Sequence, residues 1–483
     1  MVFVVKEAKM YINGQWVDAL SGETFDDFCP YTGELYAKVA KGGVADVDRV
    51  MAAAYDARKV WANTLPLTRS QIMSKAATLM WEKKDEFIDL LIHESGSAVG
   101  KAEWEVFQTA NVLQFAAEDA KRIYGETYHN EPWKVSMTWR KPRGTVVAIS
   151  PWNFPMVLAM YKIAYGLATG NTVVLKPASE TPLVCLKFAE IFEEAGLPAG
   201  AFNIITGPGS VLGDALIDDK RTSFVAITGE TVTGRKVAQR CAAQLKQYTL
   251  ELGGKNPMIV LKDANIDYAV KLAAFSAYLH QGEICMSVDK VIVEREIVKE
   301  FTEKFVGLVS HLPVGDPADP GTFIGPVISD RQAQSIDAHV KDAVAKGATL
   351  LTGGTYEGRL YQPTVLTDIT PDMKIYAEET FGPVTSIYAV DSIDEALRIA
   401  NDSEYGLSSA VVTKNLENAL YVAENLEAGM VHVNDSSVDA NEAAPFGGVK
   451  GSGIGREGGQ YSINEYTEVK WVTILKQDKQ LPF

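Results

Sequence analysis

The stretch between residues 144 and 252 alternates between continuous apolar runs and segments with helical spacing, and this pattern constrains the fold most strongly. The apolar runs are TVVAIS (145–150), NTVVLKP (171–177), FNIITG (202–207), FVAITG (224–229) and TLEL (249–252). Continuous apolar strands separated by helices are typical of a buried parallel sheet, so we predict an α/β fold. Such sheets bind ligands at the carboxyl ends of their strands. The loop-like segments PWNFP, KPASETP, GPGSVLG, TGETVTG and GGKNP all lie at these ends.

A second alternation follows residue 285 and predicts a second α/β domain. Strands are expected at 289–294, 385–390, 408–413 and 430–434, and helices at about 296–309, 331–346, 391–402 and 418–429. Residues 1–40 resemble short strands with an Asn-Gly turn, and residues 44–122 show the 3- and 4-residue apolar spacing of helices. Residues 466–476 form a strand-like run that has no later partner in the sequence.

Length and composition limit the possible classes of function. A chain of 483 residues accommodates two or three domains. A formal net charge of −16 argues against nucleic acid or an anionic membrane as a partner, and without a run of about 18 apolar residues we expect no membrane span. Four cysteines without a CxxC pair favour a reducing, cytoplasmic compartment. Six scattered histidines without ligand spacing predict no metal site.

Two reactive side chains flank the segment from residue 251 to residue 285. Glu251 ends an apolar run just before Gly253 and Gly254, and Cys285 lies in the turn-like HQGEICMS. A carboxylate and a thiol in such positions are candidates for a base and a nucleophile. By themselves, however, a lone cysteine is more often a small buried hydrophobe and a glutamate is usually solvated.

The loops at the strand ends carry further candidates. Asn153 lies in the proline-stiffened PWNFP segment, where its amide is suited to donate to an oxyanion or to cap the next helix. Lys176 ends a strand and is suited to hold a ribose or phosphate. Gly209 and Gly213 do not match the dinucleotide-binding fingerprint, whereas Gly229 lies where backbone N–H groups meet phosphate at a helix start. Surface lysines and turn glycines are the alternative interpretation.

Taken together, six motifs resemble those of the aldehyde dehydrogenase superfamily. They are PWNFP, KPASETP, ELGGKNP, QGEICMS, EETFGPV and PFGGVKGSG, in the order found in that family. The resemblance extends from about residue 11 to about residue 473. Within the superfamily the chain looks most like the benzaldehyde and vanillin dehydrogenases.

This resemblance implies catalytic roles for a small set of residues. Cys285 would attack the aldehyde carbon, and Asn153 together with the Cys285 backbone N–H would stabilise the oxyanion. Hydride transfer would leave a thioester, which water activated by Glu251 would hydrolyse. Lys162 matches the family lysine near the thiol. Glu457 matches a second proton-relay glutamate that several vanillin-type members lack.

The resemblance also implies binding sites for a cofactor, NADP or NAD, and for the substrate. The expected cofactor contacts are Ile149, Ser150, Pro151, Trp152, Asn153, Lys176, Ser179, Gly209, Gly213, Thr228, Gly229, Leu252, Glu379 and Phe381. The expected substrate contacts are Phe154, Leu158, Tyr161, Leu279 and Phe446, with Val438 nearby. These substrate contacts are apolar or aromatic, which favours benzaldehyde-like substrates. The small, neutral Ser179, close to Lys176, predicts that NADP is accepted alongside NAD.

Two positions depart from the family pattern. Glu230 stands in TGET where the family commonly has serine, so we expect no direct phosphate contact from its carboxylate. Glu283 replaces the usual glutamine two residues before Cys285. An anion there would raise the pKa of the thiol, unless its side chain points away or finds a cation.

We therefore predict an aldehyde-dehydrogenase-like α/β fold with three parts. Residues 1–122 and 143–252 would form a Rossmann-like NAD(P)-binding domain, residues 253–455 a catalytic domain, and residues 123–142 with 456–483 a β element. That element would join subunits of a homodimer or homotetramer by strand addition. The alternatives are a semialdehyde or aliphatic aldehyde dehydrogenase, a CoA-acylating relative and an inactive binding scaffold.

Overall fold

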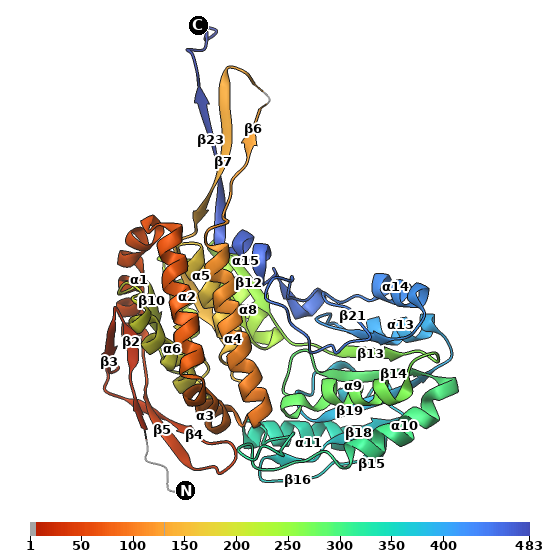
Figure 1. Ribbon diagram of the computed structural model, residues 1–483. Coiled ribbons are helices and arrows are strands. Elements are labelled where there is room, and N and C mark those ends of the chain that lie inside the picture. Colours follow the sequence, from red (N-terminus) through yellow and green to blue (C-terminus); the bar gives the residue numbers. More distant parts are fainter. Residues whose placement is uncertain (1–5, 130) are drawn as a thin grey trace.

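The predicted parallel strands form the centre of an eight-stranded sheet in the computed structural model, which describes residues 6–129 and 131–483 (Figure 1). The parallel strands are β8 (Thr145–Ile149), β9 (Thr172–Lys176), β10 (Phe202–Ile204), β11 (Thr222–Thr228) and β12 (Gln247–Glu251). The order β12-β11-β8-β9-β10 is extended by antiparallel neighbours: β2 (Met10–Ile12) and β3 (Gln15–Val17) at one edge, and β22 (Gly453–Ile454) at the other.

Helices cover both faces of this sheet, which explains why its strands are apolar throughout. The helices are α1 (Val44–Asn63), α2 (Pro66–Glu82), α3 (Lys84–Ser95), α4 (Val99–Asp119), α5 (Val157–Ala168), α6 (Pro182–Ala195), α7 (Gly209–Asp218) and α8 (Thr231–Ala243). Val146 and Ala148 of β8 pack in the core formed with α4, α5 and α6, whereas Val147 packs in the core formed with α1, α7 and α8. The period-2 alternation along the strand thus alternates between two cores.

A seven-stranded sheet, β15-β18-β19-β14-β13-β20-β21, forms the second half of the molecule. Its strands are β13 (Asn256–Val260), β14 (Val288–Glu294), β15 (Thr349–Thr352), β18 (Thr364–Thr367), β19 (Val384–Val390), β20 (Ala410–Val412) and β21 (His432–Val433). Its helices are α9 (Ile266–Tyr278), α10 (Arg295–Val309), α11 (Asp330–Ala345), α12 (Lys374–Ala377), α13 (Ile393–Asn401) and α14 (Leu416–Asn425). The sequence pattern predicted β14, β19, β20 and β21 but missed β13, β15 and β18, of which β13 lies inside the sheet between β14 and β20.

The strand-like run at the end of the chain is β23 (Thr467–Leu475), and it pairs antiparallel with β7 (Lys134–Pro142). With β6 (Thr127–Tyr128) these strands form an arm that projects from the body (Figure 1). Before the arm, α15 (Gly459–Tyr466) packs against α4 and α5.

The remaining elements are short. They are β1 (Lys6–Ala8), β4 (Thr24–Phe28) and β5 (Leu35–Ala40) in a three-stranded sheet, β16 (Tyr356–Glu357) paired with β17 (Leu360–Tyr361), and the 3-10 turns η1 (Leu279–Gly282) and η2 (Lys450–Ser452).

Candidate active site

Cys285 lies between η1 and β14 and is a half-buried free thiol. The Asn256 amide holds the backbone around it by donating to the carbonyl oxygens of Cys285 and Ser287, each over 2.8 Å. A Cβ at Gly254 would come within 2.2 Å of the Cys285 carbonyl oxygen, so only glycine fits beside the thiol loop. Burial, Glu379 and Glu251 raise the pKa of the Cys285 thiol, which is therefore protonated in this state.

Glu251 ends β12 with its side chain inside the molecule, 2% exposed. Both carboxylate oxygens are buried without a hydrogen-bond partner among the described residues. Burial, and to a smaller extent the charge of Glu457, raises the pKa of Glu251 well above its ordinary value. An unpartnered carboxyl group with a raised pKa whose charge acts on the thiol is suited to accept a proton from water or from sulfur.

Lys162 of α5 forms a buried ion pair with Glu457, with 2.8 Å between Nζ and Oε1. Its ammonium also donates to Thr228 Oγ1 over 2.7 Å and to the Leu158 carbonyl oxygen over 3.2 Å. The charge of Lys162 lowers the pKa of Cys285 and that of Glu251, so it acts on both groups through space. Thr228 and Glu457, two of the sequence candidates, therefore share this ammonium.

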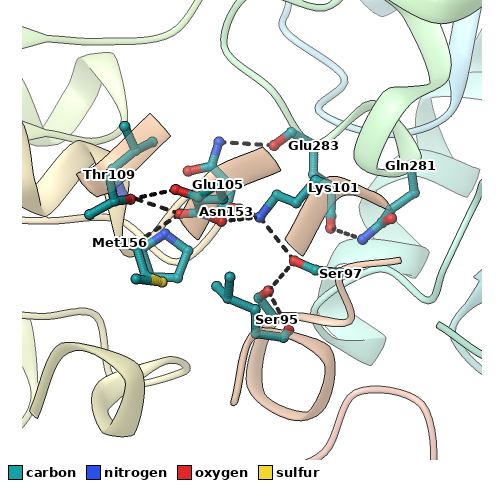
Figure 2. A network of polar contacts seen from close by, with 12 residues as sticks. Ser95, Ser97, Lys101, Glu105, Thr109, Asn153, Met156, Gln281 and Glu283 are labelled. Atoms are coloured by element: carbon teal, nitrogen blue, oxygen red, sulfur yellow. Dashed lines mark hydrogen bonds and ion pairs between the residues drawn. The ribbon is translucent and has the colours of Figure 1, made fainter. Parts of the chain in front are cut away.

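Asn153 is buried and its side-chain Nδ2 donates to the Glu283 carbonyl oxygen over 2.9 Å (Figure 2). Since an amide nitrogen carries two N–H bonds, this contact orients the group and leaves one N–H for a ligand. The Glu283 carboxylate belongs to a different set of contacts. It accepts from Ile328 N over 3.1 Å and from Gln281 Nε2 over 3.2 Å, and its charge is not among the main causes of the Cys285 pKa shift. The Glu283 side chain therefore points away from the Cys285 thiol, which was one of the two possibilities that the sequence left open.

An inner cavity of about 40 Å³ leads to Cys285. Its walls are apolar or aromatic apart from the thiol and one carboxylate, and consist of Trp104, Phe154, Val157, Leu158, Tyr161, Ile284, Met286, Val438, Asp439, Ala440 and Phe446. The predicted Leu279 instead lines an adjoining outer cavity of about 480 Å³. The two cavities share Trp104, Phe154, Val438, Asp439 and Ala440.

The sequence argument missed Trp104 and Asp439. Trp104 lies three residues after Lys101 on α4, so helical periodicity places both on one face, but nothing in the sequence shows that this face meets Phe154. The rings of Trp104 and Phe154 pack edge-to-face with 6.0 Å between centroids. Asp439 comes from a loop without periodicity.

The predicted cofactor residues gather at the carboxyl edge of the first sheet. Ile149 ends β8 and leads into Ser150, Pro151 and Trp152, while Lys176 ends β9 and Thr228 ends β11. The Lys176 side chain is buried beside Gly209 and donates to the Pro177 carbonyl oxygen over 2.8 Å; burial lowers its pKa to about 8.

Space for a nucleotide is visible at the glycines of this edge. A Cβ at Gly213 would meet no atom within 4 Å, and one at Gly229 only the side chain of Ile227 at 4.0 Å. Ser179 donates to the Gly207 carbonyl oxygen over a long 3.3 Å, and Glu180 beside it is exposed. Open backbone at helix N-termini fits the pyrophosphate of a dinucleotide.

Of the remaining cofactor candidates, Glu379 and Phe381 belong to the second half of the molecule, whereas Leu252 follows β12 of the first sheet. Glu379 accepts from Gly254 N over 2.9 Å, and its pKa is raised to about 8, mainly by burial. The Phe381 and Trp152 rings meet edge-to-face at 5.4 Å between centroids. Leu252 packs against Gly234 of α8, where a Cβ would come within 2.5 Å of it.

Glu230 is exposed at the N-cap of α8 and makes no capping hydrogen bond. Its charge contributes to the raised pKa of Glu379, which places the two carboxylates within electrostatic reach of each other.

Neither a metal site nor a membrane span is seen in the part of the chain that the structure describes. Residues 6–129 and 131–483 contain no group of three or more His, Cys, Asp or Glu side chains placed to hold a metal ion. The helices within these ranges are too short or too polar to cross a bilayer.

Comparison with known proteins gives a consistent family. The sequence profile of the aldehyde dehydrogenase family matches residues 16–472. A vanillin dehydrogenase of Corynebacterium glutamicum is 40% identical over 476 residues, covering 98% of each chain. The crystal structure of a salicylaldehyde dehydrogenase from Pseudomonas putida G7, complexed with salicylaldehyde, superposes with a TM-score of 0.97 at 40% identity, covering 99% of this chain and 100% of that one.

An NADP-dependent enzyme of E. coli superposes with a TM-score of 0.95 at 36% identity, covering 97% of this chain and 98% of that one. The family profile spans nearly the whole chain, and the vanillin and salicylaldehyde dehydrogenases are each 40% identical to it over almost its full length. The predicted fold class is confirmed. The chain therefore belongs to the aldehyde dehydrogenase family and is an oxidoreductase that uses a nicotinamide cofactor.

Proposed function

We propose that this enzyme oxidises aromatic aldehydes to carboxylic acids at Cys285. The observation that carries this proposal is the inner cavity, which is lined by the Cys285 thiol together with aromatic and aliphatic side chains. Among them, Tyr161 and Phe446 stack with 6.4 Å between ring centroids and an interplanar angle of 18°. An apolar cavity lined by aromatic rings suits a benzene ring, because aromatic side chains favour stacked or edge-to-face contacts with other rings.

In the proposed reaction the Cys285 sulfur forms a bond to the aldehyde carbon, after its proton has left. Burial favours the neutral thiol, so its proton passes to water before the sulfur attacks. The free N–H of Asn153 stabilises the oxyanion together with the Cys285 backbone N–H. A bound nicotinamide cofactor supplies the hydride acceptor. Glu251 then takes a proton from the water that cleaves the C–S bond and releases the acid.

We assign Lys162 an electrostatic role. Its ammonium is saturated by Glu457, Thr228 and a carbonyl oxygen, so it lowers the pKa of the thiol without touching the substrate. A buried base beside the thiol favours water over CoA as the acyl acceptor, and the convergence of Cys285, Glu251 and Asn153 argues against an inactive scaffold.

Charge at the cavity sets the expected substrate class. The outer cavity carries Asp435 and Asp439, and its one cation, Lys101, is 4% exposed. Carboxylated semialdehydes would meet repulsion without a partner. We expect kcat/KM for benzaldehyde to exceed that for succinic semialdehyde by about tenfold or more. Asp439→Lys should lower the ratio of kcat/KM for benzaldehyde to that for succinic semialdehyde, because the new cation can pair with the substrate carboxylate. A wild-type enzyme that prefers succinic semialdehyde contradicts the proposal.

We propose that NADP is used alongside NAD. Ser179 is small and neutral, Lys176 offers an ammonium, and Glu180 faces solvent. A carboxylate at position 179 would repel the 2′-phosphate of NADP and accept hydrogen bonds from the ribose of NAD. Ser179→Glu should therefore lower the NADP to NAD ratio of kcat/KM by about tenfold or more, a change of about 1.4 kcal/mol. Ser179→Ala is the control for loss of the hydroxyl alone. Failure of the wild type to use NADP, or an unchanged ratio in Ser179→Glu, contradicts this assignment.

We also propose the three-part division given by the sequence: residues 1–122 and 143–252 for the cofactor, 253–455 for catalysis, and 123–142 with 456–483 for assembly. The exposed apolar side chains of the arm, Trp139, Val469 and Trp471 among them, support the last assignment. An unpaired strand edge with apolar side chains favours pairing with a second copy.

A further inference from the structure

A buried ion pair on α4 contacts the loop that contains the PWNFP motif (Figure 2). Lys101 Nζ and Glu105 Oε2 are 2.6 Å apart, and their side chains are 1% and 0% exposed. The ammonium also donates to Ser97 Oγ over 2.9 Å and to the backbone carbonyl oxygen of Asn153 over 2.8 Å. All three N–H bonds of the ammonium are therefore used, which is the condition for keeping a charged lysine inside a protein.

The second carboxylate oxygen of Glu105 binds the other end of the same loop. Oε1 accepts from Met156 N over 2.9 Å and from Val157 N over 3.3 Å, at the start of α5. Lys101 and Glu105, both on α4, thus bind one carbonyl group and two N–H groups of residues 153–157. The Lys101 ammonium also lies 4.1 Å from the ring centroid of Phe154, which lines the substrate cavity.

We propose that Lys101 and Glu105 are positioning residues for the oxyanion-stabilising amide of Asn153. The inference rests on the oxyanion role proposed above. Lys101 fixes the peptide plane after Asn153 and the Glu283 carbonyl fixes its amide, so the remaining N–H has one direction. Neither residue of the pair takes part in the assigned proton or hydride transfers.

The burial of this ion pair supports a role other than stabilising the fold. A buried ion pair is weak as a source of stability, because well-packed apolar residues of similar volume usually serve as well or better. Its hydrogen bonds, in contrast, define geometry. Displacing a catalytic group by about 1 Å can lower the rate of a reaction about a hundredfold.

The test is a double-mutant cycle between Lys101→Met and Asn153→Ala in the full-length enzyme with saturating aldehyde and cofactor. Asn153→Ala should lower kcat by about 10²–10³-fold, the effect of losing one oxyanion donor. Lys101→Met should lower kcat by about tenfold or more with a smaller change in KM. The double variant should fall within about threefold of Asn153→Ala, since Lys101 acts only through the amide. Hydrolysis of 4-nitrophenyl acetate, which uses the thiol without hydride transfer, should show the same pattern.

Lys290→Met is the matched control for a buried lysine. Lys290 is 0% exposed, donates to the carbonyl oxygens of Ile399 and Asp402, and is not among the charges that shift the pKa of Cys285. We expect it to lower the melting temperature while leaving kcat within about twofold. If Lys101→Met does not fold, Ser97→Ala and Glu105→Gln weaken the same contacts and take its place in the cycle.

The outcomes separate this inference from the oxyanion assignment itself. An unchanged kcat in the Lys101 variant, or a loss that multiplies with that of Asn153→Ala, overturns the positioning role and leaves the function of Asn153 intact. An unchanged kcat in Asn153→Ala overturns both.

Discussion

At the residue scale, burial raises the pKa of several acids at the site. The pKa values of Glu283 and Glu379 are each raised to about 8, mainly by burial, and burial also raises the pKa of Glu251 well above its ordinary value. In Glu283 this has no direct bearing on the thiol, because its carboxylate is turned toward Ile328 and Gln281. The raised pKa of Glu283 should instead make the stability of the fold depend on pH.

The Glu283 carboxyl has an ordinary pKa of 4.5 and a folded value of about 8. Between these values the unfolded chain has lost the proton that the folded chain retains, so wild-type unfolding free energy falls as the pH rises through this window. The loss is on the order of a few kcal/mol. Glu283→Gln cannot ionise and should lose this part of the slope, which denaturant unfolding at pH 5 to 8.5 measures.

The exposed Glu424→Gln on α14 is the control and should keep the wild-type slope. Parallel stability curves for Glu283→Gln and wild type across this pH range would show that Glu283 ionises normally in the fold.

At the element scale, the arm exposes apolar side chains that no other described part of the monomer covers. β23 and β7 pair along nine residues each, yet Val469 and Trp471 are 59% and 67% exposed on the same face. Apolar side chains that alternate along one face of a strand normally pack against another layer.

We expect the double substitution Val469→Asp/Trp471→Asp to lower the oligomer mass seen in sedimentation velocity, because charges on that face oppose burial against a second copy. Leu245→Asp, at a site that is 91% exposed beyond α8, is the control and should leave the mass unchanged. A wild-type protein that sediments as a monomer, or a double variant with the wild-type mass, contradicts the assembly role of the arm.

At the scale of the whole molecule, local patterns account for much of the architecture. The five parallel strands were predictable because each is apolar at consecutive positions, as burial on both faces requires. β13 was missed although it lies inside its sheet, between β14 and β20. Its five residues begin within the glycine-rich ELGGKNP segment, whose glycines and proline are typical of a turn, so only three apolar positions remain to indicate a strand.

The same limit applies to the site. Cys285, Glu251 and Asn153 were identified because they lie in recognisable motifs. The i, i+4 spacing of Lys101 and Glu105 predicts an ion pair on one helix, but their contacts with residues 153–157 exist only once α4 packs beside β8 and α5. The direction of the Glu283 side chain likewise depends on Ile328, 45 positions away in sequence.

The central claim is that Cys285 carries the acyl group and that Glu251 is needed to release it. The most direct measurement is rapid mixing of Glu251→Gln with benzaldehyde and saturating cofactor, followed by quenching and mass spectrometry. We predict one equivalent of reduced cofactor per active site, turnover at least about a hundredfold slower thereafter, and a benzoyl group on the peptide that contains Cys285. Steady turnover at the wild-type rate, or a benzoyl group on any other residue, would contradict the account.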